Sequence, residues 1–195
     1  YYTDNIQKGG VKMKGLIILA NGFEDTEAIM TIDILRRAKL SLTVASAGDD
    51  VHVKSQSGLY VKAETTLKDV NDQHYDFLVL PGGRAVKDIL EHSKKVLSLI
   101  DKFVLAGKMV AAICAAPLLL GRRGYFKDQV FTCFPGCEVD IKEGKYKRKK
   151  GVIRSGKFIT ARAMGYTAQF AYEIVEYLLG KEARVKVKKN CNGEL

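Results

Sequence analysis

The sequence has no long apolar run, few cysteines and no secretory signal. No stretch approaches the roughly 20 apolar residues needed to cross a bilayer, and the N-terminus lacks the basic-then-apolar order of a signal peptide. The cysteines form no C-x-x-C pair and are too scattered for a disulfide scaffold; they lie at positions 114, 133, 137 and 191. We therefore expect a cytoplasmic protein with reduced thiols and no membrane contact.

Histidine is also scarce, which argues against two kinds of active site. We expect all three histidines, His52, His74 and His92, at the surface, so a Cys-His hydrolase would lack its base. Cys133 and Cys137 have no histidine or acidic partner at zinc-ligand spacing. The sequence therefore predicts neither a cysteine peptidase of the Cys-His type nor a metal site.

Positive charge is in excess, with 32 Lys and Arg against 22 Asp and Glu. Nine of the basic residues lie in two runs, 145–150 and 184–189. No aromatic stacking motif or recognition-helix pattern accompanies either run, so we interpret both as solvated charge. Nucleic-acid binding through residues 147–150 is the less favoured alternative.

Length and composition indicate one domain. The chain has 195 residues, of which 47% are hydrophobic and 28% charged, enough for a single buried core. Residues 1–12 contain neither a methionine nor an apolar period, so we expect a natural start at Met13 and interpret residues 1–12 as a leader. Residues 13–186 then form the domain, and residues 187–195 a basic, flexible tail.

Apolar runs alternate with amphipathic segments along that domain. Continuous apolar runs predict buried strands, and apolar residues at helical spacing predict helices. The expected strands are 15–20, 42–47, 77–80, 109–113, 130–132, 152–154 and 158–160, with a hairpin at 52–63. The expected helices are 28–38, one that follows Gly83 and ends at about 91, 96–106, one that starts near Pro117, and 167–179. This alternation predicts a mostly parallel α/β sheet with helices on both faces. In such sheets, binding sites form beyond the carboxyl ends of the strands.

Cys114 directly follows the apolar run 109–113 and precedes Ala115, Ala116 and Pro117. Small residues let a sharp turn pack tightly against neighbouring strands, and proline fits the first turn of a helix. A thiol at a helix N-terminus has a lowered pKa and is reactive. The pattern favours a nucleophile elbow; a buried structural cysteine is the alternative.

Two more loops end strands at the same predicted edge. In the first, Gly82 and Gly83 have no side chains, so their N–H groups could approach a ligand and, with that of Ala115, form an oxyanion hole. A tight turn without a ligand is the alternative. In the second, Glu24 and Glu27 begin an expected helix, where acidic residues are electrostatically favoured.

Glu27 has a second interpretation if it points into the crevice. A charged carboxylate there would raise the pKa of Cys114 by repulsion. A reactive thiol beside it therefore requires a protonated Glu27 that donates a hydrogen bond to the sulfur.

The three loops together resemble one known family. They read LIILANGFEDTE (16–27), VLPGG (79–83) and AAICAAP (111–117). In this order they resemble the ThiJ/PfpI superfamily, which is class I glutamine-amidotransferase-like, and within it the branch of the human parkinsonism-associated deglycase and bacterial YajL. The resemblance covers residues 13 to about 186. It implies a flavodoxin-like, doubly wound fold, a cysteine nucleophile elbow and a homodimer.

The resemblance also implies roles for single residues. Cys114 matches the reactive cysteine and Glu27 the glutamate hydrogen-bonded to it, while Gly82, Gly83 and Ala115 match the backbone donors around the sulfur. Further pocket or dimer-interface positions are matched by Glu24, Asp33, Arg36, Arg37, Phe134, Arg162 and Gly165.

Two positions depart from the human branch. Phe134 stands where that branch has a pocket histidine, as in the YajL pattern, and Ser57 stands where it has an arginine. No histidine follows Cys114, which disfavours the peptidase activity of the PfpI branch.

We therefore expect a cofactor-independent, cysteine-dependent enzyme: a deglycase or glyoxalase-like hydrolase or lyase. Its substrates would be small 2-oxoaldehydes or early glycation adducts. The alternative is an oxidative-stress sensor or redox-regulated chaperone, in which Cys114 is oxidised without turnover.

Overall fold

The computed structural model describes residues 13–194 and contains one seven-stranded sheet. Its strand order is β10-β11-β7-β6-β1-β2-β5, and every neighbouring pair is parallel except β10 and β11. The strands are β1 Lys14–Leu19, β2 Ser41–Ser46, β5 Thr65–Thr66, β6 Phe77–Leu80, β7 Met109–Ile113, β10 Val152–Ser155 and β11 Phe158–Ala161. The predicted mostly parallel α/β sheet is confirmed.

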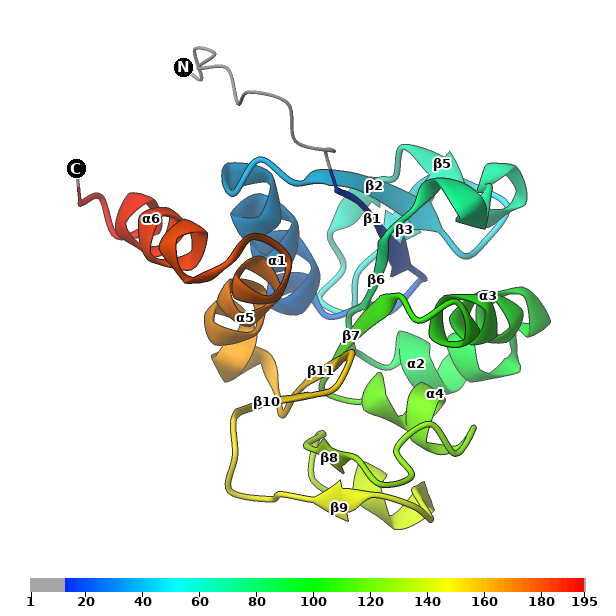
Figure 1. The fold of residues 1–195 in the computed structure, drawn as a ribbon. Coiled ribbons are helices and arrows are strands. Elements are labelled where there is room, and N and C mark those ends of the chain that lie inside the picture. Colours follow the sequence, from blue (N-terminus) through cyan, green and yellow to red (C-terminus); the bar gives the residue numbers. More distant parts are fainter. Residues whose placement is uncertain (1–12, 195) are drawn as a thin grey trace.

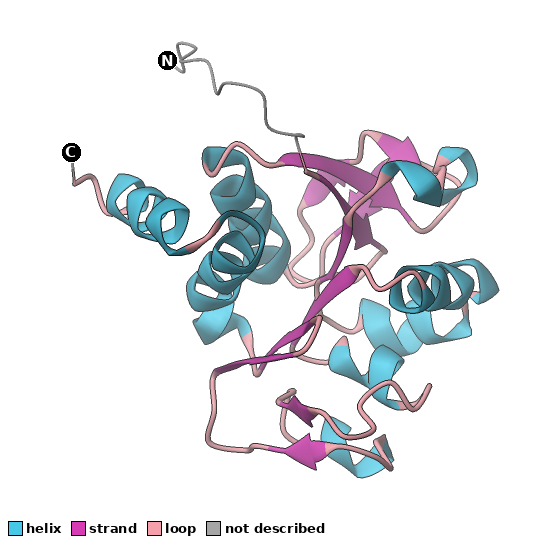
Figure 2. Ribbon diagram, viewed as in Figure 1, coloured by secondary structure: helices cyan, strands magenta, loops and turns pink. Residues whose placement is uncertain are grey.

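Helices cover both faces of this sheet (Figures 1 and 2). On one side lie α1 Asp25–Arg37, α5 Thr167–Leu179 and α6 Lys181–Cys191; on the other lie α2 Ala85–Asp88, α3 Lys94–Leu105 and α4 Pro117–Gly121. Single 3-10 turns occur at Leu67–Asp69, Asp72–His74, Leu90–His92, Cys137–Asp140 and Met164–Tyr166. None of the helices within residues 13–194 combines the length and apolar character needed to span a membrane.

Two small sheets flank the main one. Strands β3 His52–Lys54 and β4 Tyr60–Lys62 form the expected antiparallel hairpin. Strands β8 Val130–Phe131 and β9 Lys145–Tyr146 pair in parallel with each other, so the strand expected at 130–132 forms outside the main sheet.

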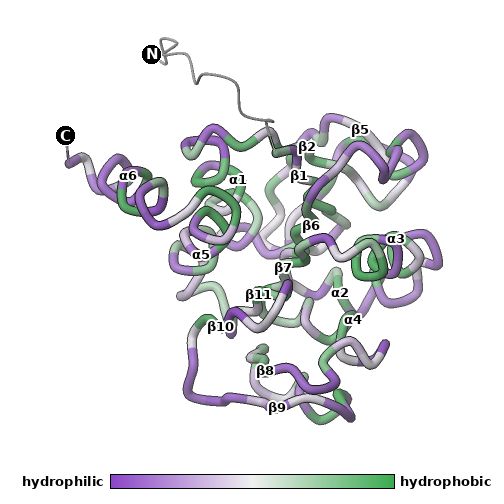
Figure 3. The backbone as a smooth tube through the Cα atoms, viewed as in Figure 1, coloured by the Kyte–Doolittle hydropathy of each residue, from purple (hydrophilic) through white to green (hydrophobic). Residues whose placement is uncertain are grey.

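The central strands are buried because helices cover them on both faces. Every residue of strands β6 and β7 is buried, in keeping with their continuous apolar sequence. Figure 3 shows these strands as apolar, whereas polar residues dominate α6 and the segment around β9. Most residues of the runs 145–150 and 184–189 are exposed; Arg184 and Val187 are the exceptions in the second run, since Arg184 is ion-paired and Val187 is buried.

The order in which strands are added to the sheet changes direction between the neighbouring strands β1 and β6. From β1 the chain moves outward to β2, then returns to build β6 and β7 on the other side of β1. Loops that leave the carboxyl ends of strands diverge at such a point and leave a crevice. The loops after β1, β6 and β7 therefore surround one crevice.

The C-terminal segment differs from the expected flexible tail. Residues 181–191 form α6, in which Val187 is buried and Arg184 pairs with Glu173 and Glu176 of α5. Apolar contact and two ion pairs hold this helix on α5, so the expectation is wrong for residues 187–191. The leader expected at 1–12 lies outside the described residues.

Candidate active site

Cys114 lies on a sharp turn between β7 and α4. Its backbone φ is 64°, in the left-handed region that residues other than glycine rarely adopt. Cys114 N–H donates to the Ala161 carbonyl over 2.9 Å, and Ala116 N–H donates to the Ile113 carbonyl over 3.0 Å. The predicted nucleophile-elbow geometry is confirmed, with the thiol presented at the carboxyl end of the sheet.

Two backbone N–H groups face the sulfur of Cys114. They belong to Gly83, after β6, and to Ala115, the next residue in the elbow, and both lower the pKa of the thiol. The Gly83 φ of 93° directs its amide toward this side, and a side chain there would overlap the Gly22 carbonyl and the Glu24 nitrogen. These are the donors that would stabilise negative charge at the sulfur or at an oxygen bound beside it.

Glu27 is fully buried directly behind Cys114. It belongs to the first turn of α1, where its N–H is capped by Glu24 Oε2 at 2.6 Å. Its Oε2 accepts a hydrogen bond of 2.8 Å from Gly82 N–H, and the carboxyl is also hydrogen-bonded to the Cys114 thiol. Oε1 has no nitrogen or oxygen partner within residues 13–194. Glu27 therefore does more than favour the start of α1: its carboxyl contacts the Cys114 thiol.

Burial raises the pKa of Glu27 to about 7, and the nearby charge of Glu24 adds to this shift. The hydrogen bonds from Gly82 and Cys114 oppose it only in part. Around neutral pH the carboxyl is therefore present in both its protonated and its charged form, so it can both accept and donate a proton.

The pKa of Cys114 does not follow the prediction. Burial raises it above its usual range, and the charge and hydrogen bond of Glu27 raise it further, outweighing the amides of Gly83 and Ala115. Helix α4 contributes little because it has only five residues and hence a small dipole. The thiol is thus neutral in the resting site, and forming a thiolate requires a base or a protonated Glu27.

Gly82 is also placed differently from the prediction. Its N–H binds Glu27 and so is not a donor to the sulfur. Instead, its missing side chain allows the site to close: a Cβ there would lie 2.6 Å from both Cys114 Cβ and Glu27 Oε2. Gly82 is a spacer between the carboxyl and the thiol.

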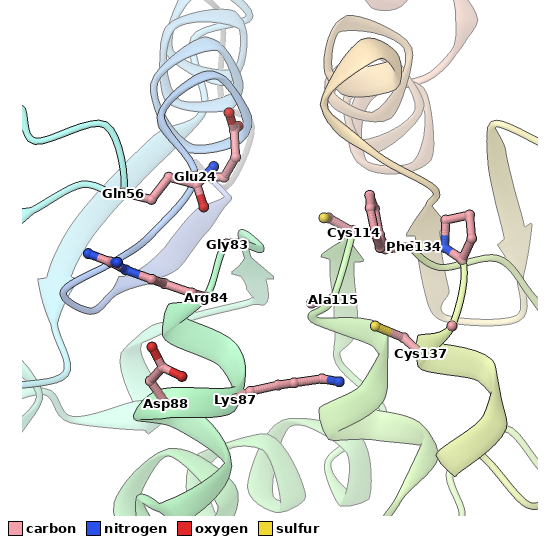
Figure 4. Close-up of a pocket in the computed structure, with 12 residues that line it drawn as sticks. Glu24, Gln56, Gly83, Arg84, Lys87, Asp88, Cys114, Ala115, Phe134 and Cys137 are labelled. Carbon is pink, nitrogen blue, oxygen red and sulfur yellow. The ribbon is translucent and has the colours of Figure 1, made fainter.

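A cavity of about 520 Å³ opens above the thiol (Figure 4). We call Glu27, Gly82, Gly83, Cys114 and Ala115 the floor of the site. We call the residues around its mouth the wall: Glu24, Gln56, Arg84, Lys87, Asp88, Phe134, Pro135, Gly136 and Cys137. The volume is in the range that holds small organic ligands.

A protein-family model, the DJ-1/PfpI family, matches residues 13–177 of the chain. The chain belongs to the DJ-1/PfpI family. It is 34% identical to Protein dj-1beta of Drosophila melanogaster over 89% of this chain and 94% of that protein. The crystal structure of Drosophila DJ-1beta superposes with a TM-score of 0.87 at 33% identity, over 93% of this chain and 98% of that one. The resemblance recognised in the sequence is confirmed.

Two further relatives extend the comparison. Protein DJ-1 homolog B of Arabidopsis thaliana is 36% identical over 89% of this chain, which spans only 40% of that protein. The glutathione-independent glyoxalase DJR-1.2 of Caenorhabditis elegans is 32% identical over 82% of this chain and 84% of that protein.

Several positions matched to the DJ-1/PfpI family lie away from the cavity. On α1, Asp33 and Arg37 pair with each other at 2.7 Å, and Arg36 pairs with Glu64. Arg162 donates to the Arg148 carbonyl and to the Tyr166 hydroxyl; Gly165 lies in the next turn. Of the pocket or interface positions matched to the family, Glu24 and Phe134 line the cavity. The lining does not include the other five, Asp33, Arg36, Arg37, Arg162 and Gly165.

The two departures from the human branch occupy different places. Phe134 lies on the wall, is 48% exposed, and its N–H donates to the Cys114 carbonyl over 2.7 Å. Ser57 lies outside the wall, and its hydroxyl donates to Asp25 over 2.6 Å.

Sequence reasoning missed much of the wall. Among the missed residues are Gln56 at the hairpin turn, Arg84 at the N-cap of α2, and Lys87 and Asp88 on α2. The spacing of the last three was a usable signal, because residues three and four apart share one helix face directly after the glycine loop. Across residues 13–194, no three side chains of metal-ligating type converge.

Proposed function

We propose that this DJ-1/PfpI family member is a cofactor-independent glyoxalase that converts small 2-oxoaldehydes to hydroxy acids. One observation carries the proposal: a buried carboxyl with a pKa of about 7 contacts the thiol of Cys114 at the floor of a ligand-sized cavity. The name of the C. elegans relative, a glutathione-independent glyoxalase, supports the reaction class.

In the first step, the Cys114 sulfur bonds to the aldehyde carbon. Because the resting thiol is neutral, ionised Glu27 takes its proton as the carbon–sulfur bond forms and the C=O π bond breaks. The N–H groups of Gly83 and Ala115 stabilise the oxygen that gains negative charge. Protonation of that oxygen gives a hemithioacetal.

In the second step, a proton moves from the former aldehyde carbon to the neighbouring ketone carbon, with Glu27 as the carrier. The first carbon is oxidised to a thioester while the second is reduced to a carbinol, so the electrons balance within the substrate. Water then cleaves the thioester, which releases the hydroxy acid and restores the thiol. Methylglyoxal plus water would give lactate.

The same attack extends to early glycation adducts. A hemithioacetal or aminocarbinol formed between methylglyoxal and another molecule releases the aldehyde reversibly, and Cys114 can then consume it. Deglycase activity would thus follow from the glyoxalase step, and its rate would be limited by release of the free aldehyde.

Lactate formation from methylglyoxal tests the proposal. We expect wild type to turn over, and Cys114→Ala to lose more than about 1,000-fold in kcat/KM, since the proposed thioester forms on the Cys114 sulfur. Cys191→Ala, a half-buried cysteine on α6, is the matched control. Equal turnover in wild type and Cys114→Ala would contradict the proposal.

A second candidate function is oxidation sensing by Cys114. Its half-buried thiol lines the cavity, whereas Cys133 is fully buried and Cys137, although it belongs to the wall, is only 5% exposed. We therefore expect peroxide to react with Cys114 before either of them. Intact-mass and peptide analysis after mild peroxide treatment tests this. Oxygen gained by the other cysteines before Cys114 would contradict it.

We also propose a homodimer that uses α1. The exposed side chains of Ile29 and Met30, 44% and 40% accessible, lie on the same helix as the matched residue Asp33. Large apolar side chains at a helix surface favour association. Sedimentation velocity of wild type and Met30→Glu tests it: a monomer in wild type would contradict the proposal.

A further inference from the structure

The wall of the site contains two cations that have no ion-pair partner. Arg84 and Lys87 line the cavity above Cys114, and within residues 13–194 neither has a carboxylate oxygen within 4 Å. Most other arginines of the described chain are paired, namely Arg36, Arg37, Arg122, Arg123, Arg154 and Arg184. Both cations are therefore available to a ligand.

Lys87 reaches across the cavity. Figure 4 shows its side chain extending from α2 toward Cys137, while Arg84 points toward the side of Gln56. The charge of Lys87 also acts on Cys137, whose pKa it lowers against the larger effect of burial. Arg84 is the N-cap of α2 and Lys87 lies in its single turn, so the two cations stand close together along the chain and face different parts of the mouth.

Acidic groups near the cavity weigh against an anion, but most of them are already engaged. Glu24 accepts the N–H of Glu27, and Glu138 accepts that of Gly136, each at 2.6 Å. Asp140 pairs with Arg122 at 2.9 Å. Asp88 alone lines the cavity without such a bond, and Figure 4 shows it on the Arg84 side, away from the tip of Lys87.

The size of the cavity also favours more than a three-carbon substrate. Cavities of about 300–1,000 Å³ hold drug-sized ligands, and this one measures about 520 Å³. Methylglyoxal, with five heavy atoms, would leave most of it empty. A longer substrate can react at Cys114 and still place its other end at Lys87.

We propose that Lys87, assisted by Arg84, forms an anion subsite beside Cys114, and that the substrates are 2-oxoaldehydes with a carboxylate or phosphate at the far end. This substrate class rests on the proposed glyoxalase function. The subsite itself is a property of the cavity and can be tested without turnover.

Alkylation of Cys114 tests the subsite alone. Iodoacetate and iodoacetamide react by the same displacement and differ in charge, so the ratio of their rates is independent of the thiolate fraction. We expect Lys87→Gln to lower the iodoacetate-to-iodoacetamide ratio about 5-fold, the order for one unit charge across a partly solvated cavity. Lys87→Arg should keep the ratio, as should the matched control Lys94→Gln, an exposed lysine on α3. An unchanged ratio in Lys87→Gln would overturn the subsite.

Turnover tests the substrate class. The probes are 4,5-dioxopentanoate, its neutral methyl ester, and the phosphate ester of 3-hydroxy-2-oxopropanal. We expect kcat/KM for at least one anionic probe to exceed that for the ester by about 5-fold or more in wild type, with the excess lost in Lys87→Gln. The larger of the two anionic values identifies carboxylate or phosphate as the natural group.

The failures are distinguishable. If methylglyoxal is turned over but neither anionic probe exceeds the ester, the substrate class is wrong and the glyoxalase proposal stands. If no probe is turned over, the glyoxalase proposal and the substrate class both fail. In that case the alkylation ratio still decides whether the anion subsite exists.

Discussion

The floor and the wall of the site are built by different means. The floor consists of one buried side chain, Glu27, one half-buried side chain, Cys114, and three backbone positions, all in the segments after β1, β6 and β7, where the strand order reverses. The wall consists largely of exposed side chains from the hairpin, α2 and the loop 134–137. The floor residues are held by hydrogen bonds such as that from Gly82 N–H to Glu27 Oε2 and by close packing around Gly82, whereas most wall side chains extend into solvent.

This contrast separates the chemistry from the choice of substrate. Changes in the floor displace the thiol or its proton carrier, so they should cost both activity and stability. Changes in the wall should alter which ligand enters and leave the fold intact.

Gly82→Ala should damage the floor most. Its new Cβ would lie 2.6 Å from both Cys114 Cβ and Glu27 Oε2, so one of the two must move. We expect kcat/KM for methylglyoxal to fall more than 100-fold, because a displacement of about 1 Å in a catalytic group has effects of this size. Unfolding in urea should show a loss of about 1–3 kcal/mol.

Gly48→Ala is the matched control for that substitution. Its Cβ would meet only Ser46 Oγ, at 3.7 Å, which is an ordinary contact. If Gly82→Ala kept the activity and stability of Gly48→Ala, the floor would have room that the structure does not show, and the contrast with the wall would fail.

Glu27→Gln should separate proton transfer from thiol reactivity. Loss of the carboxyl removes the proton carrier, so we expect kcat/KM to fall about 100-fold. The same change removes the negative charge that raises the pKa of Cys114, so alkylation by iodoacetamide at pH 8 should become faster. Glu143→Gln, an exposed carboxyl away from the cavity, is the control. A parallel fall in both rates would indicate a structural role for Glu27 instead.

Most of the floor could be predicted from the sequence because its geometry depends on local motifs. Cys114 after an apolar strand and before a proline specifies an elbow, and paired glycines specify a close approach of the backbone. What the sequence did not specify was the balance of effects on Cys114: burial and Glu27 outweigh the nearby amides. That balance depends on how much water the packed loops exclude.

The wall was largely missed because it joins segments far apart in the chain. Phe134 comes to the cavity through a loop held by its hydrogen bond to the Cys114 carbonyl. Lys87 and Arg84 are ordinary surface residues by composition; their spacing after the glycine loop indicates a shared location, but the direction of α2 is what brings them to the cavity. The C-terminal helix was missed for a similar reason, since its charged sequence hides the single buried contact of Val187.

The stability of the fold should depend on pH through Glu27. Its pKa is about 7 in the folded state against an ordinary value of 4.5 in an unfolded chain, so between these values the folded chain holds a proton that the unfolded chain has released. The contribution of Glu27 to the free energy of unfolding is fully present below about pH 4.5 and is lost as the pH rises through 7. The loss should approach about 3 kcal/mol.

Urea unfolding of wild type and Glu27→Gln between pH 4.5 and 8 measures this effect. The difference between the two proteins isolates Glu27, because contributions from other groups cancel. We expect the free energy of unfolding of wild type, relative to that of Glu27→Gln, to fall with rising pH. A constant difference would mean that the carboxyl is not protonated in the folded state, and hence that the floor contains more water than the structure indicates.

Phe134→His should have the smallest effect, because Phe134 belongs to the wall. Its ring is 48% exposed, so the change in unfolding free energy should stay within about 0.5 kcal/mol. An imidazole with an ordinary pKa of about 6.5 would add a second titration to the pH profile of kcat/KM, and we expect less than about 3-fold change at pH 8, where it is neutral. Phe134→Leu controls for loss of the ring. A 100-fold effect from Phe134→His at pH 8 would place this residue in the chemistry and erase the division between wall and floor.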